Sequence, residues 1–99
     1  MNHRRLLART LVYDGKVRPL TLLTDLGNGQ WLIEPFTHET ANTSFENQPL
    51  ALIPANDPMP VAATIDELIE LSLSSKHIEP GTKLRLITLN PSGCQEYPT

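Results

Sequence analysis

The stretch Pro54-Ala-Asn-Asp-Pro-Met-Pro60 divides this sequence into two halves of different character. Its three prolines lack a backbone donor and interrupt a helix, so the stretch predicts a connection between elements. Before it, short apolar runs alternate with turn residues, which is typical of strands. After it, the apolar residues follow a helical spacing and then a hairpin. We expect a single domain over 1–99, with a β-meander over 1–53, a proline-rich connection over 54–63, and a helix plus C-terminal hairpin over 64–99.

Turn signals delimit the strands of the first half. Asp14-Gly15 lies between two apolar runs and predicts a hairpin, because glycine adopts the positive φ that such turns need. Pro19 predicts that the return strand is an edge strand or contains a bulge. Trp31 and Leu32 put apolar side chains on both faces of the next strand, which predicts at least partial cover on each side. The strands expected here span residues 6–13, 17–26, 30–36, 40–45 and 50–53.

The second half opens with a helix signal. Thr64-Ile-Asp-Glu67 matches a capping box, in which each side chain bonds the backbone N–H of the other residue, and Pro80-Gly81 ends the helix that we expect over Thr64–Lys76. A helix of about three turns is marginal alone, so it must pack on the sheet. Strands over 83–89 and 94–97 follow. The sequence predicts a mainly β, α+β domain, built as a small antiparallel β-sandwich or open barrel with one packed helix.

The charges are distributed unevenly along the chain. The 99 residues hold 8 basic and 11 acidic side chains, a formal net charge of -3. Five basic residues and one acid give residues 1–18 a charge of +4, which leaves -7 for the rest. The candidate contacts for phosphate or an acidic partner are Arg4, Arg5, Arg9 and Arg18. The alternative is that these arginines pair with acids of the same molecule. Weak nucleic-acid binding through this basic N-terminus is only the weaker alternative function, because no aromatic residue precedes Tyr13.

Cysteine use and hydropathy indicate the compartment. The one cysteine, Cys94, excludes an intramolecular disulfide, and the first nine residues are not followed by the apolar core of a signal peptide. No apolar run approaches the roughly 20 residues that cross a bilayer. We therefore expect a cytoplasmic protein that does not bind membranes and whose partner is a second copy, as a homodimer, or another protein.

Motifs for catalysis and for metal binding are missing from the sequence. His3, His38 and His77 form neither a His-x-His nor a His-x-x-x-His pair, and no Gly-x-Ser-x-Gly elbow occurs. Gly27-Asn28-Gly29 has no third glycine, so we interpret it as a turn rather than a dinucleotide loop. We expect no enzyme, no metal and no cofactor. The alternative is a small ligand-binding domain or enzyme whose pocket gathers scattered residues: Tyr13, Trp31, His38 and Cys94.

Several short segments carry a resemblance. Val12-Tyr-Asp-Gly15, then residues 27–36, Thr43-Ser-Phe45 and Leu50-Ala-Leu-Ile-Pro54 resemble the N-terminal strands of the metal-dependent amidohydrolases, and Ile78-Glu-Pro-Gly81 before residues 84–89 is similar to the segment that returns to the same sandwich. The resemblance covers about half of the chain and implies the auxiliary β-sandwich of that family without its catalytic barrel.

The departures from that family concern its chemistry. The family carries a metal-binding His-x-His on the strand after Pro-Gly, whereas Ala55-Asn56-Asp57-Pro58 follows Pro54 here. The barrel does not fit in 99 residues, so no catalytic residue is carried over. We predict a non-catalytic binding or assembly module, because leucine-rich strands with apolar residues on both faces expose more surface than one helix covers.

Overall fold

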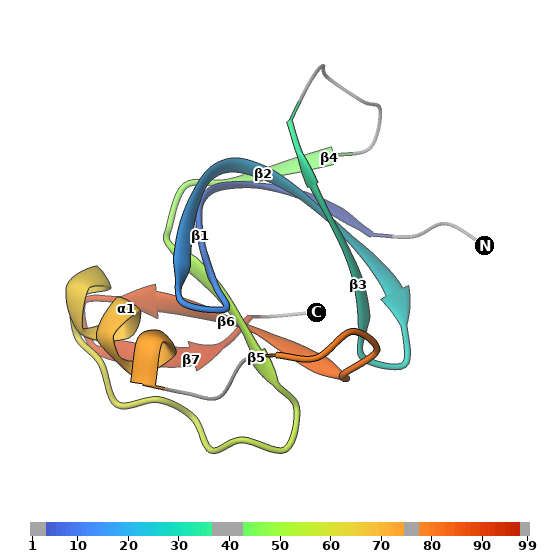
Figure 1. Ribbon diagram of the computed structural model, residues 1–99. Coiled ribbons are helices and arrows are strands. Elements are labelled where there is room, and N and C mark those ends of the chain that lie inside the picture. The colour runs from blue at the N-terminus through green and yellow to red at the C-terminus, as the bar shows by residue number, and fades with distance from the viewer. Residues whose placement is uncertain (1–3, 37–42, 75–77, 98–99) are drawn as a thin grey trace.

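A computed structural model describes residues 4–36, 43–74 and 78–97 of the chain (Figure 1). Within these ranges it contains seven strands and one helix, which confirms the mainly β prediction with a single helix. The elements are β1 (Arg5–Tyr13), β2 (Lys16–Gly27), β3 (Gln30–Pro35), β4 (Thr43–Glu46), β5 (Leu50–Pro54), α1 (Ile65–Ser74), β6 (Leu84–Asn90) and β7 (Gly93–Glu96).

The strands form one mixed sheet in the order β3-β2-β1-β5-β6-β7, and β4 also pairs with β1. β1 is antiparallel to β2 but parallel to both strands on its other edge. β4 occupies that edge from Arg5 to Ala8, and β5 continues it from Leu11 to Tyr13. The meander expected over residues 1–53 therefore describes only β1 to β3. The nine residues of β1 leave room for two short strands in line, which no local signal reveals.

The sheet curls around its inner face as an open barrel (Figure 1). The N–H of Leu84, at the start of β6, donates a 2.8 Å hydrogen bond to the carbonyl of Gly29, so two segments that are not sheet neighbours meet. The first core cluster fills the inside and takes residues from β1, β2, β5 and β6: Leu6, Ala8, Leu11, Leu23, Leu50, Leu52, Leu84 and Leu86. We call this set the barrel core.

The hairpin predictions agree with the structure. Asp14 and Gly15 have φ values of 52° and 79°, and Asn28 and Gly29 have 54° and 76°. Two successive positive φ values define the type I′ turn, whose twist matches that of paired strands. Pro19 pairs with Thr10 of β1, while the pairing of β2 with β3 begins only at Thr21. The first part of β2 is therefore an edge within the described residues, as Pro19 predicts.

The helix begins as predicted, although its cap differs in detail. The Glu67 N–H donates to the Thr64 hydroxyl oxygen at 3.2 Å, which confirms Thr64 as the N-cap. The Thr64 hydroxyl in turn donates to the Glu67 carboxylate, also at 3.2 Å, in place of the expected backbone contact. The helix is described to Ser74, and the predicted end at Lys76 lies outside the described residues.

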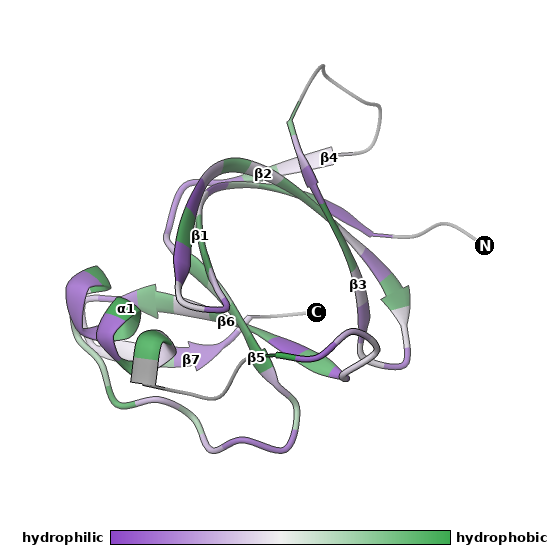
Figure 2. Cartoon of the chain, viewed as in Figure 1, coloured by the Kyte–Doolittle hydropathy of each residue, from purple (hydrophilic) through white to green (hydrophobic). Residues whose placement is uncertain are grey.

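Under α1, a second core cluster covers the opposite face of β1, β5 and β6. We call it the helix core, and its buried residues are Val12, Ala51, Ala62, Leu68, Ile87 and Leu89. β5 and β6 are hydrophobic along most of their length (Figure 2), since each contributes to both cores. The partial cover predicted for both faces of the third strand agrees with the structure, since Trp31 and Ile33 pack against the barrel core and Leu32, on the other face, is 44% exposed. The helix packs on β1 and β2 and contributes Leu68 to the helix core.

Candidate binding groove

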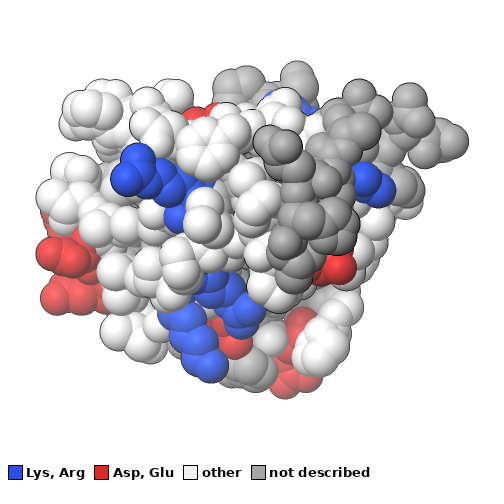
Figure 3. Space-filling model, turned by 90° about the horizontal axis from the view of Figure 1, so that it is seen from above, with Lys and Arg blue, Asp and Glu red and all other residues white. Residues whose placement is uncertain are grey.

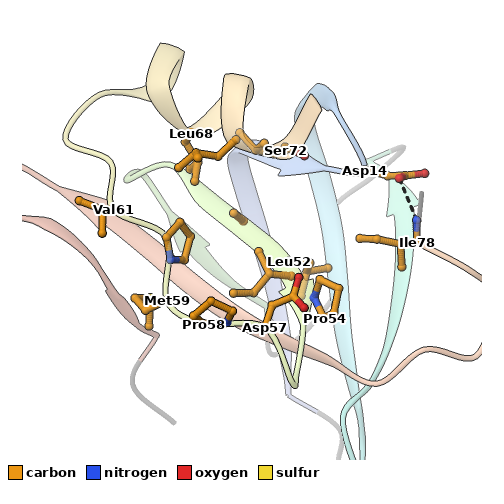
Figure 4. A pocket seen from close by; sticks show the side chains of 15 residues that line it. Asp14, Leu52, Pro54, Asp57, Pro58, Met59, Val61, Leu68, Ser72 and Ile78 are labelled. Carbon is orange, nitrogen blue, oxygen red and sulfur yellow. Dashed lines mark hydrogen bonds between the residues drawn. The ribbon is translucent and has the colours of Figure 1, made fainter. Parts of the chain in front are cut away.

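A groove of about 500 Å³ lies between α1, β5 and the connection that joins them (Figure 4). Its floor includes Ala51 and Leu52 of β5, and Leu68 and Leu71 of α1 form one wall. Met59 belongs to the opposite wall, on the connection. Ligand pockets typically measure roughly 300–1,000 Å³ and are lined mainly by apolar side chains. The groove has the size and lining of such a pocket.

The groove is present because α1 and the proline-rich connection cover only part of the helix core. The ten-residue helix α1 is only about 15 Å long, so it does not cover the full length of the paired strands beneath it. The proline-rich connection makes a wide excursion before it reaches the helix (Figure 1). Its first residues are fixed, since the Ala55 N–H bonds the Lys83 carbonyl at 2.9 Å and the Asp57 N–H bonds the Pro54 carbonyl at 3.0 Å. Prolines at 54, 58 and 60 restrict the rest of this wall.

The tip of the β1–β2 hairpin joins the helix at one end of the groove. The Gly15 N–H donates to the Ser72 hydroxyl oxygen at 2.7 Å. The next contact lies nearby, where a carboxylate oxygen of Asp14 accepts the Ile78 N–H at 3.1 Å (Figure 4). These two hydrogen bonds connect the hairpin with α1 and with the chain that follows it. Asp14, Ser72 and Ile78 all line the groove.

The charged residues of the groove gather at the same end. Tyr13 pairs in parallel with Leu52, so Asp14 lies level with the last residues of β5. The backbone bond from Asp57 to Pro54 keeps Asp57 at that end too. Figure 4 shows the Asp57 carboxylate between Pro54 and Pro58, directed into the groove, with Met59 and Val61 further along. The groove therefore has an acidic end and an apolar end.

The four predicted arginines do not form one patch. Arg4 lies over the Tyr97 ring at 5.0 Å, and Arg18 lies over the Tyr13 ring at 5.7 Å. Arg9 donates to the Asn47 side chain at 2.9 Å, and Arg5 is exposed on β1. Basic side chains appear at separate places on the face shown in Figure 3. The contacts of Arg4, Arg18 and Arg9 described above are with two tyrosine rings and an asparagine, whereas the alternative predicted pairing with acids.

The predicted pocket residues are also not brought together. Tyr13 and Trp31 pack against the barrel core, while Cys94 packs against the helix core, so the sheet separates them. None of these three lines the 500 Å³ groove, and His38 lies outside the described residues. Each of these residues was a candidate because of its polar or reactive side chain. Successive side chains of a strand point to opposite faces of the sheet, so Cys94 lies on a different face from Tyr13 and Trp31.

The ionisation of these residues follows their surroundings. Burial, with the Asp14 carboxylate beside it, raises the pKa of Tyr13 above its ordinary value, although Arg18 opposes this. Burial raises the pKa of the Cys94 thiol, which donates a weak 3.7 Å hydrogen bond to the Ala62 carbonyl. A raised thiol pKa lowers the fraction of thiolate, the form that acts as a nucleophile. Cys94 therefore has the environment of a structural cysteine.

A second, smaller cavity of about 250 Å³ lies near the β2–β3 turn, where the sheet approaches itself. Trp31 and Tyr97 line it together with two ion-paired or stacked arginines, Arg4 and Arg85. Arg85 lies 3.3 Å from the Glu96 carboxylate. The arginines of this cavity therefore lie near acidic side chains, because Glu96 pairs with Arg85 and Asp25 lines the same cavity.

Across residues 4–36, 43–74 and 78–97, no three His, Cys, Asp or Glu side chains are grouped as metal ligands would be. Over the same part of the chain, every helix is shorter or more polar than a membrane-crossing helix must be.

Sequence reasoning missed the groove residues. Asp57 and Met59 were assigned to a connection, and Asp14 was assigned only to a turn. The clustering of three prolines around Asp57 and Met59 was a usable signal, because a rigid connection beside a short helix leaves an uncovered surface. The groove itself could not be located without the position of α1 relative to β5, which the sequence does not show.

Comparison of the chain with protein-family models, with curated proteins and with solved structures finds no significant match. The resemblance to the auxiliary sandwich of the amidohydrolases stays a prediction. Arguments about function therefore rest on the groove and its residues.

Proposed function

We propose that this protein is a non-catalytic binding module that holds an apolar segment of a partner protein in the groove under α1. The observation that carries the proposal is the groove itself, a 500 Å³ depression with a predominantly aliphatic and proline lining. Covering such a surface removes apolar area from water, which is the main favourable contribution to most protein association. The prolines of the wall reduce the ordering that binding requires.

Apolar surface beyond the groove favours a protein segment over a small molecule. Val61, on the groove wall, is 92% exposed, and Leu73, on α1 but outside the groove lining, is 64% exposed. Leu71 also lines the groove and is 40% exposed. A small ligand enclosed by the groove would leave Leu73 in water, since Leu73 does not line the groove. An extended segment that continues past the groove would contact it.

A neutral probe tests whether the groove binds apolar groups. We expect titration of the ¹⁵N-labelled full chain with 1-hexanol to shift the amide signals of Ala51, Met59, Leu68 and Ser72 in a saturable way, while those of β3 stay unchanged. Leu71→Lys places a charge on the groove wall and should abolish these shifts. Leu32→Lys is the matched control, since Leu32 has nearly the same exposure (44% against 40%) and lies on β3, away from the groove.

Two results would contradict the proposed function. One is the absence of saturable shifts at the groove residues of the wild-type chain. The other is an equal loss of shifts in both lysine variants, because the groove would then not be the place where the probe binds.

A further inference from the structure

We infer that the groove selects a segment of a partner protein that carries a lysine or arginine next to its apolar residues, with the cationic group held at the Asp57 end. This inference rests on the proposed function and adds to it the chemical class of the occupant. It is carried by the charges and hydrogen-bonding groups of the groove lining.

The charge of the lining has one sign. Among the described residues that line the groove, both charged side chains are acids, Asp14 and Asp57. They lie at one end, as the pairing of Tyr13 with Leu52 and the bond from Asp57 to Pro54 show. A cleft with one sign of charge and apolar walls concentrates ligands of the opposite sign. The groove therefore favours a ligand that is apolar along its length and cationic at one end.

The backbone of the proline-rich wall favours a hydrogen-bond donor. Pro54, Pro58 and Pro60 have no N–H, and the N–H groups of Ala55 and Asp57 are already used in backbone bonds. The Pro54 carbonyl already accepts the Asp57 N–H, but each backbone carbonyl has two lone pairs, so this wall still offers acceptors. Ammonium and guanidinium groups carry only donors, so they match a wall of carboxylates and carbonyls. A carboxylate at the same position would meet like charges and few donors.

Three probes with the same apolar tail separate charge from hydrophobicity. The ¹⁵N-labelled full chain is titrated at pH 7 and low salt with n-hexylammonium, 1-hexanol and hexanoate. We expect n-hexylammonium to bind about threefold tighter than 1-hexanol, the effect of one solvent-accessible ion pair, and hexanoate to bind more weakly than either. The advantage of the ammonium should shrink in 1 M salt, where charges are screened beyond about 3 Å.

A substitution assigns the preference to Asp57. Asp57→Asn keeps the shape of the side chain and should bring the affinities for n-hexylammonium and 1-hexanol to within experimental error. Glu70→Gln is the matched control, because Glu70 is an exposed acid of α1 that does not line the groove. It should leave the threefold preference unchanged.

The outcomes distinguish the inference from the proposed function. If 1-hexanol binds at the groove and all three probes bind equally, the binding module stands and the cationic preference is overturned. If 1-hexanol does not bind, the proposed function fails as well. If sedimentation shows a dimer that n-hexylammonium dissociates, the occupant is a second copy of this chain, and the partner segment is overturned.

Discussion

The two cores of this protein lie on opposite faces of the same strands but are closed in different ways. The barrel core is enclosed by the curled sheet, whose hydrogen bonds continue from β3 to β7 and link Leu84 to Gly29. The helix core is closed only by α1 and a proline-rich connection, and a groove of about 500 Å³ remains beside Leu68.

Under the proposed function, this difference would separate stability from binding. The curled sheet encloses most of the barrel core, and its residues Leu6, Leu11, Leu23 and Leu50 are completely buried. The short helix covers its strands incompletely, so the second face offers both the apolar groove and the carboxylates at its edge. Variants that affect one core should therefore differ in predictable ways from variants that affect the other.

The largest effect is expected from a matched pair of leucine truncations. Leu11→Ala, in the barrel core, should lower the free energy of unfolding by about 4 kcal/mol, because a closed core retains the full cavity. Leu68→Ala, in the helix core, should lower it by about 2.5 kcal/mol, since Leu68 borders a groove that is already open. Urea denaturation followed by the fluorescence of Trp31 measures both. Equal losses would contradict the comparison.

A smaller effect is expected at the hairpin tip that joins the helix. Gly15→Ala should lower the free energy of unfolding by about 2 kcal/mol, because a positive φ of 79° disfavours alanine and the new Cβ would lie 3.1 Å from the Leu73 side chain. The control is Gly27→Ala, whose φ of 87° is equally strained but whose Cβ meets open space. It should cost about 1 kcal/mol. A difference of zero would mean that the hairpin does not pack on α1.

The helix cap should affect only one of the two cores. Thr64→Ala removes the oxygen that accepts the Glu67 N–H and should cost about 1 kcal/mol. We expect hydrogen exchange to become faster for the amides of α1 and to stay the same for those of β1. Equal acceleration in both elements would show that the helix opens only with the whole domain.

The smallest effect concerns alkaline pH. Tyr97 donates a 2.9 Å hydrogen bond to the Glu46 carboxylate, and burial followed by this contact raises the pKa of Tyr97 above 10.0. The unfolded chain then loses its tyrosine proton first, so this contribution to stability is complete below pH 10 and is lost as the pH rises through the folded pKa. Absorbance at 295 nm should show Tyr→tyrosinate conversion at a higher pH in the folded chain than in urea. In the Tyr97→Phe variant, the part of the absorbance change that is shifted to higher pH should be smaller by the contribution of one tyrosine.

Local signals account for most of the elements that the sequence predicted. The hairpins at Asp14-Gly15 and Asn28-Gly29 follow from residues that tolerate positive φ, and the helix start follows from Thr64 and Glu67. These features depend on neighbours within a few residues. The sequence therefore contains their whole cause.

Long-range pairing explains what could not be predicted. The parallel pairing of β4 and β5 with β1 joins residues about forty apart, and no turn signal marks it. The groove depends on that pairing, since it places Asp14 beside the end of β5 and near Asp57. Tyr13, Trp31 and Cys94 were grouped by their chemistry alone, and the sheet distributes them between two cores.

Selection from a library of random dodecapeptides displayed on phage tests the central claim most directly. The wild-type chain serves as bait, and peptides that also bind the Leu71→Lys variant are removed. The account predicts enriched peptides that combine aliphatic residues with a lysine or arginine and that compete with n-hexylammonium. Failure to enrich any peptide, or enrichment of peptides with aspartate or glutamate beside the aliphatic residues, would contradict it.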